Sequence, residues 1–376
     1  MSKLKKIIKW TFAIIAAILI LFLTLVWFIT YHPRDIQPEQ VVCSDQSPAL
    51  KPGKKLKVLS WNIQYMAGKN YVFFYDMKDG SGPDDRPSAE DIAITTKEVA
   101  RIIQEENPDI ILLQEVHEGA KRTDYQDQLA NLLSLLSKEY SCYASTFYWK
   151  ASFIPHPHIM GAVGLKLATI SKYKINEAIR YQLPLIPANP IFQQFNFKRA
   201  VLEVRLPVEN AKDLVVLNTH FDAFVPDTVT MEGQVKKVNS ILEEITQNGN
   251  PWIIGGDYNL VPPGRSYSKL KEEYLSAMPS EHTGDWYGRR FIKRETEIVI
   301  LYEKYQAVPS LQEVNDPGYE QWFTHFPNDP GIEKPDKTID YIFMSDNIHL
   351  GEHYVRHQNT LTLSDHLPVL VEFEIP

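Results

Sequence analysis

The sequence predicts an α/β domain that follows one N-terminal transmembrane helix. Two observations indicate this fold class: an uncharged apolar run near the amino terminus, and amphipathic helical segments that alternate with short apolar strands from residue 57 onward. The chain has 376 residues, of which 44% are hydrophobic and 23% are charged, so it can build a large core. This length would allow two domains. Because no internal repeat or second domain boundary is apparent, we expect one large α/β sandwich.

The first thirty residues have the composition of a membrane anchor. An uncharged run from Trp10 to Ile29 is long enough to cross a bilayer as one helix, and aromatic residues stand near both ends. A cleaved signal peptide is the alternative, but the run is long for one and no small-residue cleavage site follows it. Lysines precede the run, so the positive-inside rule places the amino terminus in the cytoplasm. We therefore expect residues 1–31 to be a cytoplasmic tip and single-pass anchor, with an extracytoplasmic (periplasmic, luminal or extracellular) remainder.

Residues 32–56 are rich in Pro, Gln, Ser and Lys and show little periodicity, so they are predicted to be a tether to a domain at 57–376. The two cysteines, Cys43 and Cys142, could form one bridge outside the cytoplasm, but their spacing does not predict it. No zinc-type Cys/His spacing occurs. The formal net charge of -8 argues against general attraction to nucleic acid, although local basic patches are not excluded.

Helices and strands are expected to alternate within residues 57–376. The first helix begins at a capping box formed by Ser88 and Asp91 and ends before Pro108. Two further helices are expected at about 125–137 and 228–247. Apolar strands are expected at 57–63, 109–115, 140–148, 164–171, 200–208, 213–220, 252–257, 337–344 and 367–375.

Two irregular segments lie between these elements. The loop 70–87 carries an aromatic cluster, which indicates either a functional rim or side chains buried under the edge of the core. The segment 262–335 has a weak pattern and contains a basic cluster. That cluster could contact a phosphate or an anionic surface, and a solvated loop is the alternative. Its members are Arg289, Arg290, Lys293 and Arg294, beside Trp286 and Tyr287.

The stretch 252–259 is the segment around which the chain is organised. A short apolar strand runs into Gly255 and Gly256 and then presents Asp257 and Asn259. An Asp at the end of a buried strand has a fixed direction, and glycines let the backbone approach a ligand closely. This arrangement suits a catalytic base. The alternative is a tight turn that uses Asp and Asn for local hydrogen bonds.

Several other predicted strands also end in polar side chains. Each has a simple structural explanation, such as an exposed acid, a turn amide or a core histidine. Asp340 is different because it lies inside an apolar strand, where a buried carboxylate needs a partner such as histidine. The strand-end groups are Asn62, Glu115, His220, Asp257 with Asn259, and Asp365 with His366.

Six short motifs, in this order, closely resemble those of the endonuclease/exonuclease/phosphatase superfamily. That superfamily includes pancreatic-type deoxyribonucleases, apurinic-site endonucleases, inositol polyphosphate 5-phosphatases and neutral sphingomyelinases. The resemblance runs from about Lys57 to the carboxyl terminus, but the segments 70–87 and 262–335 match no particular subfamily. The motifs are Ser60-Trp61-Asn62, Leu113-Gln114-Glu115, Leu217-Asn218-Thr219-His220, Gly256-Asp257-Tyr258-Asn259, Ile339-Asp340-Tyr341-Ile342 and Ser364-Asp365-His366.

The resemblance implies a four-layer α/β sandwich, in which two mixed β-sheets pack together with helices outside. It also implies Mg²⁺, with Mn²⁺ as a substitute; Mg²⁺ is a hard cation that takes oxygen ligands. Glu115 resembles the principal metal carboxylate, with Asn62 and Asp365 beside it.

The resemblance implies catalytic roles for five further residues. Asp257 matches the residue that positions or deprotonates the attacking water, and its pKa should be depressed beside a divalent cation. Asn259 matches the residue that orients the water or the phosphate. His366 would contact the phosphoryl oxygens, held in its tautomer by Asp340, and His220 matches a second histidine at the scissile phosphate.

Together these features predict a membrane-anchored, metal-dependent phosphoric ester hydrolase, either a phosphodiesterase or a phosphatase, with a monomeric catalytic domain. The anchor, the acidic composition and the aromatic loop favour a lipid-linked or small phosphodiester as substrate. A nuclease acting on DNA or RNA is the main alternative, because many members are nucleases and the basic cluster could bind a backbone. A non-catalytic binding domain on the same fold is a further alternative, although all the expected catalytic positions are retained.

Overall fold

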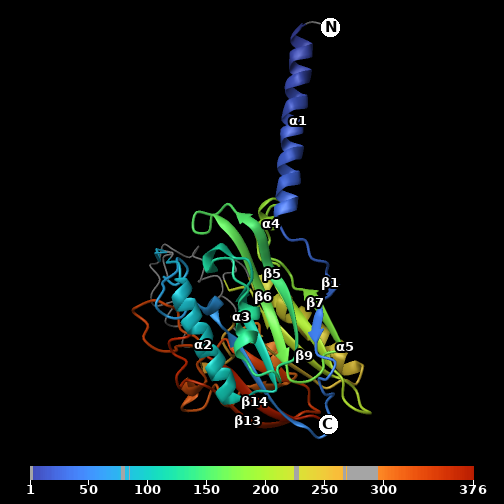
Figure 1. The fold of residues 1–376 in the computed structure, drawn as a ribbon, viewed down its shortest axis with the longest axis vertical. Coiled ribbons are helices and arrows are strands. Elements are labelled where there is room, and N and C mark those ends of the chain that lie inside the picture. Colours follow the sequence, from blue (N-terminus) through green and yellow to red (C-terminus); the bar gives the residue numbers. More distant parts are fainter. Residues whose placement is uncertain (1–2, 78–80, 84, 224–227, 266–267, 269–294) are drawn as a thin grey trace.

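The computed structural model describes residues 3–77, 81–83, 85–223, 228–265, 268 and 295–376. Two mixed seven-stranded sheets pack face to face, helices cover their outer faces, and one long helix projects from the domain (Figure 1). The predicted fold class, a four-layer α/β sandwich preceded by an apolar N-terminal helix, is confirmed.

The first sheet, called Sheet I, has the strand order β13-β14-β3-β4-β6-β5-β2. Only β3 and β4 are parallel neighbours; the other pairs are antiparallel. Its strands are β2 (Val41–Cys43), β3 (Lys55–Asn62), β4 (Ile110–His117), β5 (Cys142–Ile154), β6 (Gly161–Ser171), β13 (His349–Val355) and β14 (Val369–Glu374).

The second sheet, Sheet II, has the order β1-β7-β8-β9-β10-β12-β11. Here β9 and β10 are the parallel pair. The strands are β1 (Ile36–Pro38), β7 (Glu177–Gln182), β8 (Ala200–Leu206), β9 (Leu214–His220), β10 (Trp252–Asp257), β11 (Gln306–Val308) and β12 (Asp340–Met344).

The amphipathic helices α2, α3 and α5 form the outer layers, and the remaining described helices are short, except α1, which projects from the domain. In α2, the Ser88 side chain accepts from the backbone N–H of Asp91 as the capping box predicts, and Asn107 closes the helix in a left-handed conformation. The helices are α1 (Lys3–Ile29), α2 (Ala89–Glu106), α3 (Gln128–Leu135), α4 (Phe192–Phe195), α5 (Thr228–Gln247) and α7 (Val299–Tyr302), with 3-10 turns η1 (Gln64–Met66), η2 (Lys121–Thr123) and η4 (Tyr319–Trp322).

Apolar side chains hold the layers together. Those between the sheets form one core, to which Val58 of β3 and Val204 of β8 both belong. α2 and α3 pack on the outer face of Sheet I, and α5 packs on the outer face of Sheet II around Trp252. Burial of this apolar surface is the main favourable contribution to folding.

α1 is long and apolar enough to cross a membrane, and only Val26 is buried in it. The tether predicted at 32–56 contains two short strands, of which β1 pairs with β7 and β2 pairs with β5. Strands of three residues are too short to show periodicity, which is why the sequence pattern missed them.

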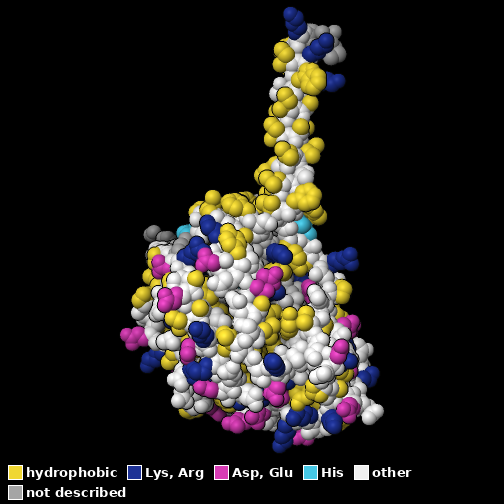
Figure 2. Space-filling view, viewed as in Figure 1, with side chains coloured by type: hydrophobic (Ala, Val, Ile, Leu, Met, Phe, Trp, Pro, Cys, Tyr) yellow, Lys and Arg dark blue, Asp and Glu magenta, His cyan; other side chains and the backbone are white. Residues whose placement is uncertain are grey.

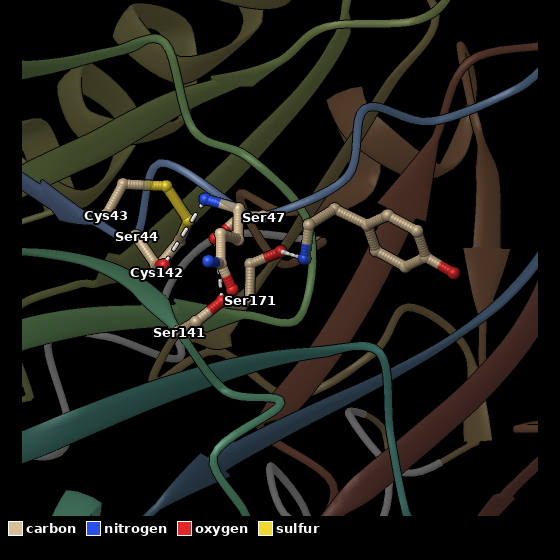
Figure 3. Close-up of a disulfide and its surroundings, with 8 residues drawn as sticks. Cys43, Ser44, Ser47, Ser141, Cys142 and Ser171 are labelled. Atoms are coloured by element: carbon tan, nitrogen blue, oxygen red, sulfur yellow. Dashed lines mark hydrogen bonds between the residues drawn. A yellow bond between two sulfur atoms is a disulfide. The ribbon is translucent and has the colours of Figure 1, made fainter.

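Cys43 and Cys142 form a disulfide (Figure 3). It joins β2 to the start of β5, whereas α1 meets β5 near its other end, where Thr30 forms a bridge with Ala151. A disulfide is typical of oxidising compartments, so the disulfide and the N-terminal apolar helix together indicate an extracytoplasmic domain.

Most aromatic side chains of the loop 70–87 pack against the core, as the second of the two interpretations of this loop expected. Phe73 is fully buried, and Tyr71 and Tyr75 pack against the core between the sheets. Phe74 stacks on His158 at the tip of the β5–β6 hairpin, with ring centroids 4.5 Å apart. The basic cluster at 289–294 lies outside the described residues.

Candidate functional site

Neighbouring strands bring the predicted site residues to one edge of the sandwich. In Sheet II, Asp257 at the end of β10 is aligned with His220 of β9 and with Asp340 of β12. In Sheet I, Asn62 ends β3 beside the end of β4, which carries Glu115. Strand register therefore gathers groups that are far apart in the sequence.

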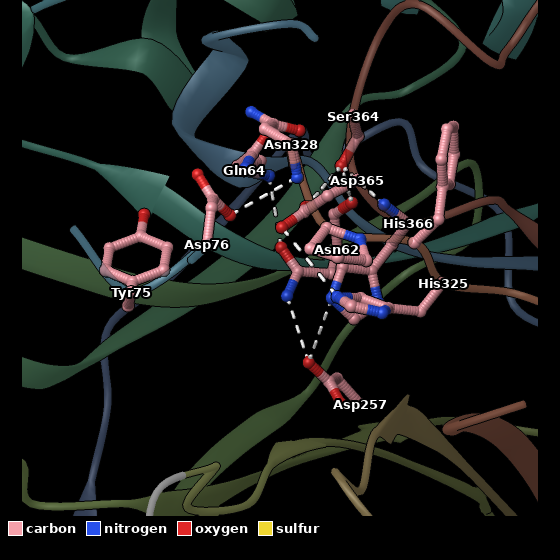
Figure 4. A network of polar contacts seen from close by, with 12 residues as sticks. Asn62, Gln64, Tyr75, Asp76, Asp257, His325, Asn328, Ser364, Asp365 and His366 are labelled. Atoms are coloured by element: carbon pink, nitrogen blue, oxygen red, sulfur yellow. Dashed lines mark hydrogen bonds and ion pairs between the residues drawn. The ribbon is translucent and has the colours of Figure 1, made fainter. Parts of the chain in front are cut away.

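Asp257 is buried and belongs to a polar network, and Figure 4 shows it below Asn62 and His366, with dashed lines to both. Its Oδ2 accepts from Asn62 Nδ2 at 3.1 Å and lies 3.2 Å from His220 Nε2 and 3.5 Å from His366 Nε2. Burial raises the pKa of Asp257 to about 7, the His366 charge lowers it and the Asp340 charge raises it. In the protein alone the pKa of Asp257 is therefore raised, and the lowered pKa that the sequence led us to expect would require a bound cation.

The buried carboxylate of Asp340 has the histidine partner that the sequence required. His366 Nδ1 lies 2.8 Å from Asp340 Oδ2, so Nε2 faces Asp257. Burial by itself would lower the pKa of His366, but the nearby carboxylates of Asp340, Asp257 and Asp365 outweigh it and raise this pKa to about 10. Asp340 therefore fixes both the orientation and the charge of this imidazole.

A tight turn after β10 holds Asp257 in place. The backbone N–H of Asn259 donates to Asp257 Oδ1 at 2.9 Å, and the Asn259 side chain donates to the carbonyl oxygen of Phe221. Asn259 has a φ of 51°, in the left-handed region that Asn tolerates well. The catalytic-base and turn interpretations of this stretch are thus compatible, because the turn orients the carboxylate.

Glu115 and Asp365 flank this centre. Glu115 lies at a β-bulge of β4 with a φ of 57°, and its Oε1 is 4.0 Å from His220 Nε2. Burial is the main cause that raises the pKa of Glu115. Burial also raises the pKa of Asp365 to about 7, the His366 charge lowers it and the Glu115 charge raises it. Bulges often aim a side chain into a site.

The donor chemistry fits a hard divalent cation. Among the described residues, no Lys or Arg nitrogen lies within 4.0 Å of the carboxylates of Glu115, Asp257 or Asp365; histidines are their nearest ionic partners. Buried acids without such partners are costly, and a bound cation would balance their charge.

Two groups in the described chain have ligand atoms within 4.8 Å of one another. One contains His325, Asp365 and His366, and the other contains Asp257, Asp340 and His366. Neither includes Glu115. Asp365 belongs to both the predicted metal-ligand set and one of these groups.

Three residues around the site were not predicted. The His325 ring meets the His366 ring edge to face, with centroids 4.5 Å apart, and His325 Nε2 lies 4.0 Å from Asp365 Oδ2. Tyr148 Oη lies 3.3 Å from His220 Nδ1, and the Arg199 guanidinium lies over the Tyr148 ring. Most of the other site residues were predicted because they lie where an apolar strand ends at a turn. None of these three residues has that position.

Comparison with known proteins assigns the family. A family model described as Endonuclease/Exonuclease/phosphatase family matches residues 59–366. The chain belongs to the endonuclease/exonuclease/phosphatase family. Members of this family are mostly metal-dependent phosphoesterases, so a phosphoester substrate and a divalent metal are implied at the family level.

Two solved structures of family members share the fold of this chain, and a third structure is similar to it at a lower TM-score. An endonuclease/exonuclease/phosphatase from Beutenbergia cavernae DSM 12333 has a TM-score of 0.54 and 20% identity, over 86% of this chain and 72% of that one. A family protein from Leptotrichia buccalis C-1013-b has a TM-score of 0.51 and 19% identity, over 85% and 100%. The human Nocturnin catalytic domain with bound sulfate anion has a TM-score of 0.48 and 19% identity, over 90% and 98%. No curated protein gives a significant match.

Proposed function

We propose that the chain is a membrane-anchored, Mg²⁺-dependent hydrolase of phosphate esters. The convergence of Asn62, His220 and His366 on Asp257, with Asp340 behind His366, carries this proposal. Hydrolysis of a phosphate ester by water needs a base, hydrogen-bond donors for the phosphoryl oxygens and charge compensation. This network offers all three.

Each catalytic group has a role that its contacts support. Asp257 takes the proton of the attacking water, which Asn259 helps to orient. The water oxygen bonds to phosphorus while the ester P–O bond breaks, and the leaving oxygen takes a proton from solvent to form the alcohol. His366 donates from Nε2 to a phosphoryl oxygen because its Nδ1 is bonded to Asp340. His220 is the second imidazole at the phosphate.

Glu115, Asn62 and Asp365 would hold the cation, Mg²⁺ or Mn²⁺ as its substitute. When bound, the ion would act as a Lewis acid on the phosphate and stabilise the leaving oxygen. A divalent charge nearby favours ionised Asp257, whose pKa is otherwise about 7. The base would then be ready at neutral pH.

The topology and substrate complete the proposal. Residues 1–31 form the cytoplasmic tip and anchor, 32–56 connect them to the domain, and 57–376 form an extracytoplasmic, monomeric catalytic domain. The favoured substrate is a lipid-linked or small phosphodiester. Nucleic acid is the competing substrate, and a panel of substrates distinguishes the two.

The test is a substrate panel with the full chain in nanodiscs: a chromogenic phosphodiester, phospholipids, sphingomyelin, plasmid DNA and RNA, each with Mg²⁺ and with EDTA. Asp257→Asn should lower turnover by about 10²–10⁴-fold, because it removes the base and keeps the shape. Asp346→Asn, at an exposed position after β12, is the matched control and should have no effect. Full activity of Asp257→Asn would refute the mechanism. Absence of both turnover and Mg²⁺ binding would favour a non-catalytic domain, and cleavage of nucleic acid alone would establish a nuclease.

A further inference from the structure

The apolar helix is attached directly to the sandwich. Thr30 forms a β-bridge with Ala151 of β5, and β1 pairs with β7 a few residues later. Between these contacts, the buried guanidinium of Arg180 donates to the carbonyl oxygens of Arg34 at 3.4 Å and Phe147 at 3.3 Å. Because these contacts leave no free linker after α1, the helix sets the orientation of the domain relative to the bilayer that it would cross.

The candidate site lies at the same end of the sandwich as α1. On β6, Lys166 lies beside the bulge that contains Glu115, whereas Val163 is paired with Ala151, the partner of Thr30. Lys166, at the height of the site, and Val163, at the height of the Thr30 bridge, are three residues apart on β6. Three residues correspond to roughly 10 Å along a strand. The polar layer on each side of a bilayer is about 5–8 Å thick. With Thr30 at the hydrocarbon boundary, the site edge would lie only a few ångströms beyond the head-group layer.

Large apolar side chains are exposed at this end, beside the foot of α1 (Figure 2). We call four of them the apolar rim. They lie on the tip of the β5–β6 hairpin and next to or within α4, which are joined where Trp149 Nε1 donates to the carbonyl oxygen of Phe195 at 2.7 Å. The members of the rim and their exposed fractions are Phe153 (39%), Met160 (50%), Ile191 (40%) and Phe192 (66%).

The charge of this region also differs from that of the whole chain. Between residues 140 and 202 the only acid is Glu177, although the chain as a whole has a net charge of -8. Glu177 begins β7 at the end remote from α1, where it is paired with Arg205. Basic residues near the rim, such as Lys150 and Lys121, complement anionic phospholipid head groups. Glu118 also lies beside the hairpin, but its carboxylate is paired with Lys166 Nζ at 2.6 Å. Unpaired basic side chains are not needed for an apolar surface to suit a bilayer interface, and the lysines near the rim add to its attraction for anionic lipids.

We infer that the apolar rim docks on the bilayer that holds α1, so that the candidate site opens toward the head-group layer. A protein partner is a weaker explanation, since α1 confines the rim to the membrane side of the domain. Where this inference extends to substrate it rests on the proposed function, and it then specifies the substrate class: a phosphate ester of a lipid, presented from the membrane surface.

The depth of the rim can be measured without any activity. The described chain has no free cysteine, so single variants Phe153→Cys and Phe192→Cys can each carry one nitroxide label in the full-length protein. The protein would be placed in nanodiscs of phosphatidylcholine with phosphatidylglycerol. Leu135→Cys is the matched control, 37% exposed at the end of α3 remote from α1.

Both rim labels should be more accessible to oxygen than to a water-soluble nickel complex, and the control label should show the reverse. Rim labels that resemble the control would overturn the inference. Rim labels shielded from both reagents would also overturn it, because a protein would then cover the rim.

An activity measurement tests the substrate class separately. The double variant Phe153→Glu/Phe192→Glu should hydrolyse soluble bis(4-nitrophenyl) phosphate at the wild-type rate. It should hydrolyse a long-chain alkyl 4-nitrophenyl phosphate embedded in vesicles at least about fivefold more slowly, while Leu135→Glu changes neither rate. Equal rates on the embedded substrate would refute the extension to lipid substrates. A wild-type protein that cleaves neither would refute the proposed function and leave the label result to decide docking.

Discussion

Gly256 offers a direct test of whether the position of Asp257 matters. A Cβ at Gly256 would lie 2.0 Å from the carbonyl oxygen of Thr219 on the paired strand β9, whereas real Cβ contacts essentially never fall below 3.0 Å. Gly256→Ala must therefore displace β10 from β9 by about 1 Å. A displacement of that size at a catalytic group can cost roughly 100-fold in rate. Overpacking should also cost about 1–3 kcal/mol of stability.

Gly249 supplies the control for that loss of stability. It has a φ of +78°, and no atom lies within 4 Å of the place that a Cβ would occupy, so Gly249→Ala should only strain the backbone after α5. That strain costs about 1–2 kcal/mol, comparable with the loss at Gly256. Urea unfolding would compare the stabilities, and turnover of a chromogenic phosphodiester with Mg²⁺ would compare the activities.

We expect Gly256→Ala to lose about two orders of magnitude in turnover and Gly249→Ala to keep its activity at similar stability. The reasoning would be refuted if Gly256→Ala kept more than about a third of the wild-type rate. It would also be refuted if both variants lost activity in proportion to stability.

Three further predictions follow from the structure. Replacing Cys43 and Cys142 with serine should lower the free energy of unfolding by about 4–5 kcal/mol, because the disulfide closes a loop with a sequence separation of 99; an unchanged urea midpoint would contradict this. His325→Gln should lower turnover by roughly 10–100-fold with little loss of stability, because its ring supports His366; a wild-type rate would show that this contact is only structural. Lys198→Met should stabilise the protein by about 1–2 kcal/mol at pH 7 and not at pH 10.5, measured by urea unfolding. Burial lowers the pKa of Lys198 to about 8 from 10.5, so its charged form destabilises the fold below pH 8 and this cost vanishes as pH rises to 10.5; a pH-independent difference would refute it.

The sequence predicted those parts of the fold whose patterns are local. β10 and β9 are apolar runs that end in polar groups, and both appear where they were expected. β7 was missed because Arg180, a charged residue, occupies an inward position where an apolar one is typical. β13 was missed because it is an edge strand with mostly exposed, polar residues. Periodicity fails where a buried charge or an edge breaks the alternation.

The candidate site shows a similar division. Asp340 could be paired with a histidine from sequence because a buried carboxylate needs a partner, and His366 is that partner. His325 could not be found in this way. It reaches the site through isolated bridges with Lys337 and His366 in a segment without periodic pattern, so only the folded loop brings it there.

The site is divided between the two sheets, so its geometry depends on how they pack. Asn62 and Glu115 come from Sheet I, whereas His220 and Asp257 come from Sheet II. Among the described strands, none pairs with strands of both sheets, so strand register does not connect these two halves. A buried amide pair behind the site does connect them: Gln114 Nε2 donates to Asn218 Oδ1 at 2.7 Å.

The Asn218 amide in turn donates to the carbonyl oxygens of Leu113 at 3.0 Å and Ala168 at 2.9 Å, both in Sheet I. Gln114 and Asn218 are fully buried, and losing these bonds would leave their amide N–H groups unpaired, so the bonds favour the observed placement of the two sheets. Gln114 directly precedes Glu115 in its motif, and Asn218 lies two residues before His220. The polar residues of the motifs therefore serve two purposes: those at the strand ends perform chemistry, and those just before them align the sheets so that the chemical groups meet.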